Sequence, residues 1–122
     1  MYPLLATFLL LHGLAHLVGF VGPWGLSNSV QPQSTLLAGR ISIGMIAMRT
    51  LGIFWLGGAL AFTVAAVGVL RHAPWWPGFT FGAAIGSLIL SILSVPQSKI
   101  GIPINVAIIV TMMLSHLEVA TT

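Results

Sequence analysis

The chain has 122 residues, of which 57% are hydrophobic and only 4% are charged. A water-soluble domain carries about 25% charged residues, so the composition excludes a water-facing fold and indicates a protein that contacts the lipid bilayer. The net charge of +3 rests on 4 Lys+Arg against 1 Asp+Glu, too little basic charge for a nucleic-acid surface, and we expect no nucleic-acid partner.

Charged residues and turn signals divide the chain into four apolar stretches, each close to the roughly 20 residues that cross a bilayer as a helix. The first is expected at about 4–21, before a Gly-Pro-Trp-Gly turn, and a long loop over 22–49 follows it. The remaining three are expected at about 50–70, 79–95 and 102–119. The sequence therefore predicts an all-α protein, an integral membrane four-helix bundle that forms a single transmembrane domain.

Two features of the flanking segments bear on topology. The apolar half of the long loop, 36–48, is either a segment at the membrane surface or an extension of the second helix. Arg40, Arg49 and Lys99 fall on one side of the predicted membrane, and Arg71 falls on the other. Because Lys and Arg concentrate in cytoplasmic loops, this count predicts that both termini lie outside the cytoplasm.

Small residues on the third span predict close helix packing. Gly82 and Gly86 follow a G-x-x-x-G spacing, and Ser87 and Ser91 continue the row at helical spacing. Lipid provides no hydrophobic drive between helices, so small residues that let backbones approach hold such bundles together. We expect this row to pack within the chain or to contact another membrane subunit or a second copy.

Polar residues inside the spans are few. His12 and His16 lie one turn apart on the first helix, and Asn105 lies near the start of the fourth. Counting along the spans places His16, Arg49 and Asn105 at a similar depth. Because an unpaired polar group is costly in hydrocarbon, these three residues are expected to form an inner structural polar cluster.

The H-G-L-A-H run at 12–16 invites comparison with metal motifs. In H-E-x-x-H proteases the Glu is the general base, but Gly13 stands at that position here. A zinc ion would need a further ligand from His72, His116 or Glu118, and the depths of His12 and His16 do not suit them. We therefore predict no metal site.

A tetrapyrrole is the second cofactor class considered for this helix. His12 or His16 is a candidate axial ligand to haem or to a chlorophyll-type chlorin, because the adjacent Gly13 leaves room for a flat macrocycle. The alternative is that each imidazole hydrogen-bonds a neighbouring helix. The sequence leaves both alternatives open.

Three motifs carry a resemblance to small four-span bacterial membrane proteins of undefined function. They are H-G-x-x-H-x-x-G-F at 12–20, R-x-x-G-x-x-W-L at 49–56 and K-[FI]-G-x-x-x-N at 99–105. The chain departs from that group in its longer first loop and at Ser98, where the group often has an acidic residue. The resemblance implies a multi-pass protein of the bacterial inner (plasma) membrane, and it supplies no activity. It singles out four residues: His12, His16, Arg49 and Asn105.

The function expected from the sequence is non-catalytic. Neither a nucleophile–base pair nor a metal site assembles from the sequence, so we expect no enzyme. The chain is expected to be an accessory or structural subunit of a larger membrane complex, or a homo-oligomer. The alternative is a membrane subunit that binds a haem- or chlorophyll-type cofactor through His12 or His16.

Overall fold

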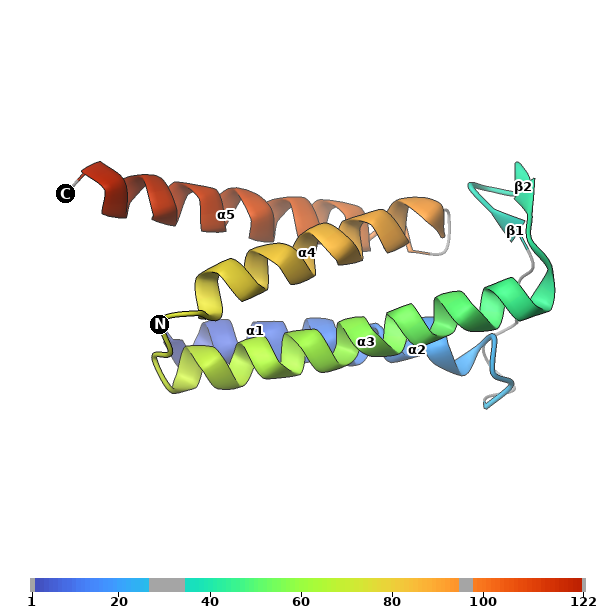
Figure 1. Ribbon diagram of the computed structural model, residues 1–122, viewed down its shortest axis with the longest axis horizontal. Coiled ribbons are helices and arrows are strands. Elements are labelled where there is room, and N and C mark those ends of the chain that lie inside the picture. Colours follow the sequence, from blue (N-terminus) through green and yellow to red (C-terminus); the bar gives the residue numbers. More distant parts are fainter. Residues whose placement is uncertain (1, 27–34, 95–97, 122) are drawn as a thin grey trace.

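The computed structural model describes residues 2–26, 35–94 and 98–121, with side chains described as far as residue 115. The chain is mostly helical, as predicted, and its helices form four rods (Figure 1). The first rod consists of two consecutive segments, α1 (Tyr2–Ala15) and α2 (Leu17–Val21). The other rods are α3 (Gly44–Leu70), α4 (Trp76–Leu93) and α5 (Gly101–Thr121).

Three of these rods are long and apolar enough to cross a membrane, namely 2–21, 44–70 and 76–93. The described apolar part of α5, Gly101–Ser115, is shorter. Large apolar side chains cover the outside of the rods, as at Leu4 (77% exposed) and Ile46 (87% exposed). Surfaces of this kind are consistent with contact to a lipid bilayer.

The loop predicted over 22–49 ends earlier than expected, and its last part contains two short strands. The helix α3 already begins at Gly44, so residues 44–48 extend the second span. Before it, β1 (Thr35–Leu36) and β2 (Ile41–Ser42) pair as a short antiparallel hairpin, which was not expected. The backbone N–H of Leu37 donates to the carbonyl of Leu93 at 2.9 Å, which ties the hairpin to the end of α4.

The third span is shifted by a few residues from the predicted 79–95. The helix α4 begins at Trp76, because Pro77 occupies its first turn, where the missing N–H of proline costs no hydrogen bond. It ends at Leu93, and residue 95, the predicted end of this span, lies outside the described residues.

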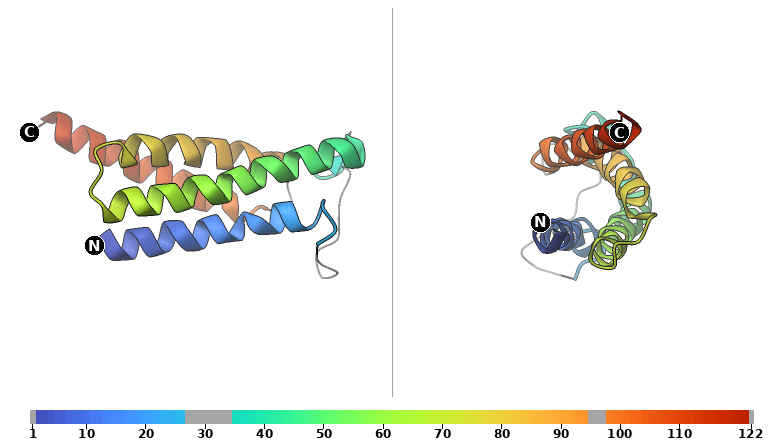
Figure 2. Two further views of the ribbon diagram at one scale, coloured as in Figure 1. Left: turned by 60° about the horizontal axis from the view of Figure 1, so that its bottom comes forward. Right: turned by 90° about the vertical axis from the view of Figure 1, so that its left-hand side faces the viewer.

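Each rod packs against the next one along the chain, in the order first rod, α3, α4, α5. Successive rods run in opposite directions, so both termini lie at one end and the hairpin lies at the other (Figure 1). Seen end-on, the four rods form an open arc with the first rod and α5 at its two ends (Figure 2). This arrangement leaves the inner face of the arc available for side chains from all four rods.

The apolar core fills the half of the arc nearer the termini. Phe62 and Val69 from α3 are fully buried there, as is Leu9 from α1. Ala84 of α4 and Ile108 of α5 complete the contact from the other side of the arc.

Gly82 and Gly86 do not make the helix contact within the chain that was the first of the two alternatives for this row. A Cβ added at either position would meet no atom within 4 Å, whereas Ser87 and Ser91 are buried. The close backbone approach lies instead between the first rod and α3: a Cβ at Gly13 would lie 3.0 Å from Cβ of Phe62. Small residues do bring two helices together, but on a different pair of helices.

Candidate functional site

The site begins at a local irregularity in the first rod. The backbone N–H of His16 donates to the carbonyl of Gly13 at 3.0 Å, three residues back rather than four. The carbonyl of His12, which an ideal α-helix would pair with that N–H, instead accepts a hydrogen bond from Nδ1–H of His16 at 2.8 Å. The imidazole thus takes the place of a backbone donor at the junction of α1 and α2.

This contact fixes the tautomer of His16. A carbonyl oxygen only accepts, so Nδ1 carries the proton and Nε2 of the neutral ring presents a lone pair. Oγ of Ser87 on α4 lies 2.6 Å from that Nε2, so the Ser87 hydroxyl is the donor. The first rod is thereby joined to α4 by a directed hydrogen bond.

Asn105 on α5 extends the arrangement. Its side-chain Nδ2 donates to Oγ of Ser87 at 2.8 Å and to the carbonyl of Gly101 at 2.8 Å, which uses both of its amide hydrogens. Its Oδ1 accepts from Nε2–H of His12 at 3.1 Å. Asn105 is fully buried, so these bonds replace all contact with solvent.

The four side chains His12, His16, Ser87 and Asn105 form a closed circuit, called here the polar ring. Every polar hydrogen of these side chains has an acceptor, either another member or a backbone carbonyl. Fully satisfied buried networks of this kind fix a unique packing, whereas partly satisfied ones are costly. The polar ring therefore joins the first rod, α4 and α5 at the middle of the arc.

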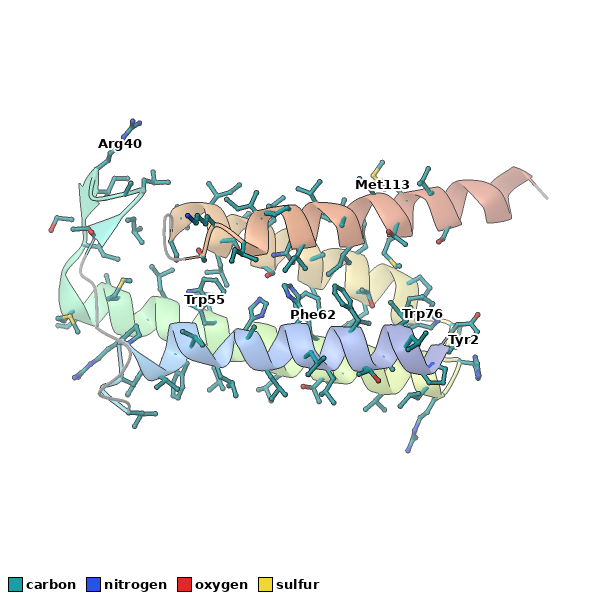
Figure 3. The ribbon with its side chains drawn as sticks, turned by 180° about the vertical axis from the view of Figure 1, so that it is seen from behind. Tyr2, Arg40, Trp55, Phe62, Trp76 and Met113 are labelled. Atoms are coloured by element: carbon teal, nitrogen blue, oxygen red, sulfur yellow. The ribbon has the colours of Figure 1, made fainter. Side chains whose placement is uncertain are left out.

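Aromatic side chains of α3 enclose the two imidazoles. Phe62 lies edge-on to His12, with ring centroids 4.7 Å apart, and its centroid is 5.2 Å from that of His16. The ring centroid of Trp55 also lies 5.2 Å from that of His16. Phe62 and Trp55 both point from α3 into the inner face of the arc (Figure 3).

A glycine of α3 makes room for His16. A Cβ added at Gly58 would lie 2.7 Å from Cδ2 of His16, a distance that real Cβ atoms do not show. The neighbouring Gly57 has open space around it. Gly58 is therefore needed for the imidazole to reach Ser87, and Gly57 is not.

The structure corrects the predicted cluster at Arg49. His16 and Asn105 do come together, through Ser87, but Arg49 points away from them. Nε of Arg49 donates to the carbonyl of Pro23 at 3.3 Å, and its guanidinium lies 5.7 Å from the Trp24 ring centroid. Because α3 starts at Gly44, Arg49 lies in its second turn, and its long side chain reaches the turn after α2 instead of the centre of the arc.

A partly open cavity of about 330 Å³ lies beside the polar ring, toward the hairpin end. Its walls come from all four rods and include His12 and His16. Ser94, at the end of α4, also lines it, and Oγ of Ser94 is buried without a hydrogen-bond partner among the described residues. Ser87 is absent from the cavity lining.

The arrangement does not suit the predicted axial-ligand role of the histidines. An imidazole that ligates iron through Nε2 needs that atom free, but Nε2 of His12 is bonded to Asn105 and Nε2 of His16 to Ser87. A macrocycle would have to break the polar ring to bind there. Among the described residues, moreover, no three His, Cys, Asp or Glu side chains are grouped to hold a metal ion.

The structure also brings together a pair that sequence reasoning missed. Ser87, His16 and the His12 carbonyl have the spacing of a nucleophile, a base and an orienting group. Ser87 was assigned to helix packing, because a serine in a row of small residues gives no sign of its partner 71 positions away. Ser87 is only 2% exposed and also accepts from Asn105, so its hydroxyl faces no space in which a substrate would fit.

Comparisons of the chain with protein-family models, with curated proteins and with solved structures found no match. The resemblance to small four-span bacterial membrane proteins thus rests on the three sequence motifs and stays a prediction.

Proposed function

We propose that the chain is a small multi-pass protein of the bacterial inner membrane in which α5 also crosses the bilayer, giving an integral membrane four-helix domain. In this proposal it acts as a non-catalytic accessory or structural subunit, in a larger membrane complex or in a homo-oligomer. The observation that carries the proposal is the polar ring, whose members spend their hydrogen-bonding capacity on one another and on the backbone. A ring of this kind stabilises an arrangement of helices, and it uses the hydroxyl of Ser87, the amide of Asn105 and both ring nitrogens of His16.

The length of α5 supports its placement as a fourth span. Its 21 residues correspond to about 31 Å at 1.5 Å per residue, close to the thickness of a hydrocarbon core. Asn105 on this helix is buried at the centre of the arc. The exposed hydroxyls of Thr111 and Ser115 on this helix each donate to a carbonyl one turn back, so they are satisfied within α5 and suit a position in lipid.

The ends of the rods support the proposed orientation, with both termini outside the cytoplasm. Arg40, Arg49 and Lys99 belong to the hairpin end, and Arg71 belongs to the end that holds both termini. Trp24 lies at the first end and Trp75 at the second, as expected of aromatic side chains at the two interfaces.

The proposal is tested by purifying the full chain in a mild detergent and measuring the mass and visible absorption of what elutes. We expect a colourless particle heavier than the 12.8 kDa monomer plus detergent, containing either further copies or a co-purifying membrane protein. A bare monomer would refute the subunit proposal. A Soret or chlorin band that tracks the protein, and is lost in His12→Leu or His16→Leu, would refute the purely structural role of the histidines in favour of the cofactor alternative.

A matched pair of variants sharpens this test. Gly86 and Gly57 both have open space around them, on α4 and α3 respectively. If the small-residue face of α4 contacts the partner, Gly86→Leu lowers the assembled fraction, while Gly57→Leu leaves it unchanged. Equal effects of the two substitutions would show that the small-residue face of α4 does not contact the partner.

A further inference from the structure

We infer that the cavity beside the polar ring binds an uncharged, lipid-soluble molecule that carries a hydroxyl group on an otherwise apolar body. The inference goes beyond a subunit role, and it rests only on the proposed membrane placement. Its first support is size, because ligand pockets start at about 300 Å³ and this cavity measures about 330 Å³. At about 30 Å³ for each water-sized group, it holds roughly ten heavy atoms. A helix from a partner, about 10 Å across, is too wide for it.

The walls of the cavity exclude a charged ligand. Most of the surface comes from apolar side chains, including Met48 and Trp55 of α3 and Ile104 of α5. None of the described residues that line it is Arg, Lys, Asp or Glu. An ionised group placed there would lose its water and find no opposite charge, so the occupant is neutral.

One wall of the cavity is polar, which distinguishes it from a gap filled by lipid chains. Ser91, Ser94 and Ser98 line it along the end of α4 and the turn that follows. The Ser98 hydroxyl donates to the carbonyl of Ser91 at 2.8 Å, so its oxygen still has lone pairs to accept with. Oγ of Ser94 is itself buried, so the hydroxyl of Ser98 is the contact that the cavity offers. A hydrocarbon chain gives the Ser98 oxygen no donor, whereas a ligand hydroxyl donates to it.

The cavity is accessible from the surroundings of the rods. Val18 on α2 is 56% exposed and Ile100, just before α5, is 69% exposed, and both residues line the cavity. These two residues therefore lie at the mouth of the cavity. With the rods in a bilayer, a molecule dissolved in the lipid reaches the serine wall without crossing water.

The experiment uses Trp55 as a reporter, because it lines the cavity and the chain has only 4 tryptophans. The full chain with Trp24, Trp75 and Trp76 replaced by Phe is placed in phosphatidylcholine nanodiscs. Quenching of Trp55 is then titrated with 4-bromophenol, with its hydroxyl-free counterpart 4-bromotoluene, and with the anion 4-bromobenzenesulfonate. After correction for partitioning into lipid, we expect saturable quenching by 4-bromophenol, at least tenfold tighter than by 4-bromotoluene, and none by the sulfonate.

Three variants locate the binding. Ala15 lines the cavity and is exposed, so Ala15→Phe fills the space and should abolish saturable quenching. Ala107→Phe is the matched control, because Ala107 is exposed on α5 away from the cavity. Ser98→Ala removes the accepting oxygen and should reduce the preference for 4-bromophenol over 4-bromotoluene to less than threefold. If Ala15→Phe lowers the melting temperature of the protein, Val18→Phe is used as the cavity-filling variant in its place.

Two results would overturn the inference. Linear, unsaturable quenching by both neutral probes would show that Trp55 only meets probe dissolved in lipid. Saturable quenching that survives both cavity-filling variants would place the ligand elsewhere. Extraction of the chain from membranes by alkaline carbonate would refute the membrane placement instead, and the same titration in detergent then decides separately whether the cavity binds.

Discussion

Nε2–H of His12 on α1 donates to Oδ1 of Asn105 on α5 at 3.1 Å, and the two residues lie 93 positions apart in the chain. The helices that carry them are the two ends of the open arc, and each packs along a different neighbour. The contact therefore links the first rod to the last one directly. Ser87 makes the same link from the intervening α4, through His16 on one side and Asn105 on the other.

The first prediction concerns Asn105. Asn105→Leu removes the acceptor of His12 and a donor to Ser87, so the free energy of unfolding in detergent should fall by about 1–3 kcal/mol. A double-mutant cycle with His12→Leu should give a coupling of about 0.6 kcal/mol, the average for hydrogen bonds between membrane helices, and at most about 1.7 kcal/mol. Denaturant melts of the four proteins measure both quantities.

Thr111→Val is the control on the same helix, because the Thr111 hydroxyl is exposed and donates to the carbonyl of Ala107 within α5. It should change the unfolding free energy by less than about 0.5 kcal/mol. A coupling of zero between His12 and Asn105, with Asn105→Leu no worse than Thr111→Val, would show that the polar ring does not hold the rods together.

The sequence predicted the helical architecture well because composition alone determines it. A chain with 4% charged residues has to pair its backbone internally in lipid, and its few breaks are marked by glycine, proline and charged residues. The bounds of α3 were missed because Gly44 and the apolar 36–43 carry no clear start signal. The hairpin at 35–42 is tied to the end of α4 by a backbone contact, which has no signature in the sequence.

The candidate site was partly predictable. His16 and Asn105 were placed at one depth by counting residues, and they share the Ser87 hydroxyl. Counting gives depth but not direction, and for that reason it also included Arg49, whose side chain turns toward Pro23. The direct partner of Asn105 on the first rod is His12, because the imidazole of His16 is turned by its own bond to the His12 carbonyl.

The second prediction uses two adjacent glycines. Gly58→Ala places a methyl group against the His16 ring and should destabilise the fold by about 1–3 kcal/mol, the usual cost of over-packing. Gly57→Ala meets open space and should be neutral or stabilising by up to about 1 kcal/mol, because alanine favours helix over glycine. Thermal melts of the two variants under identical conditions provide the comparison. Equal melting temperatures would mean that His16 does not occupy this position.

The third prediction concerns the proposed topology. The chain has no native cysteine, so single substitutions can be labelled without a background. Ser42 lies in the hairpin and His72 follows α3 at the opposite end, and both are exposed. In intact cells, a membrane-impermeant maleimide should label His72→Cys, whereas Ser42→Cys should react only after the membrane is opened. The reverse pattern would invert the proposed orientation, and labelling of both sites in intact cells would refute a spanning α3.

The last prediction addresses the resemblance of Ser87 and His16 to a nucleophile–base pair. The hydroxyl–imidazole distance of 2.6 Å and the oriented Nδ1 meet the geometry of such a pair, but a nucleophile also needs space for a carbonyl above its oxygen. Ser87 is 2% exposed and its oxygen already accepts from Asn105, so a fluorophosphonate should not label the folded chain. Ser87→Ala should instead lower the free energy of unfolding by about 1–3 kcal/mol, because it leaves donor and acceptor groups of Asn105 and His16 unpaired. Intact-mass analysis after incubation with the probe decides between the two roles, since a single adduct that disappears in both Ser87→Ala and His16→Leu would identify an enzyme rather than a structural link.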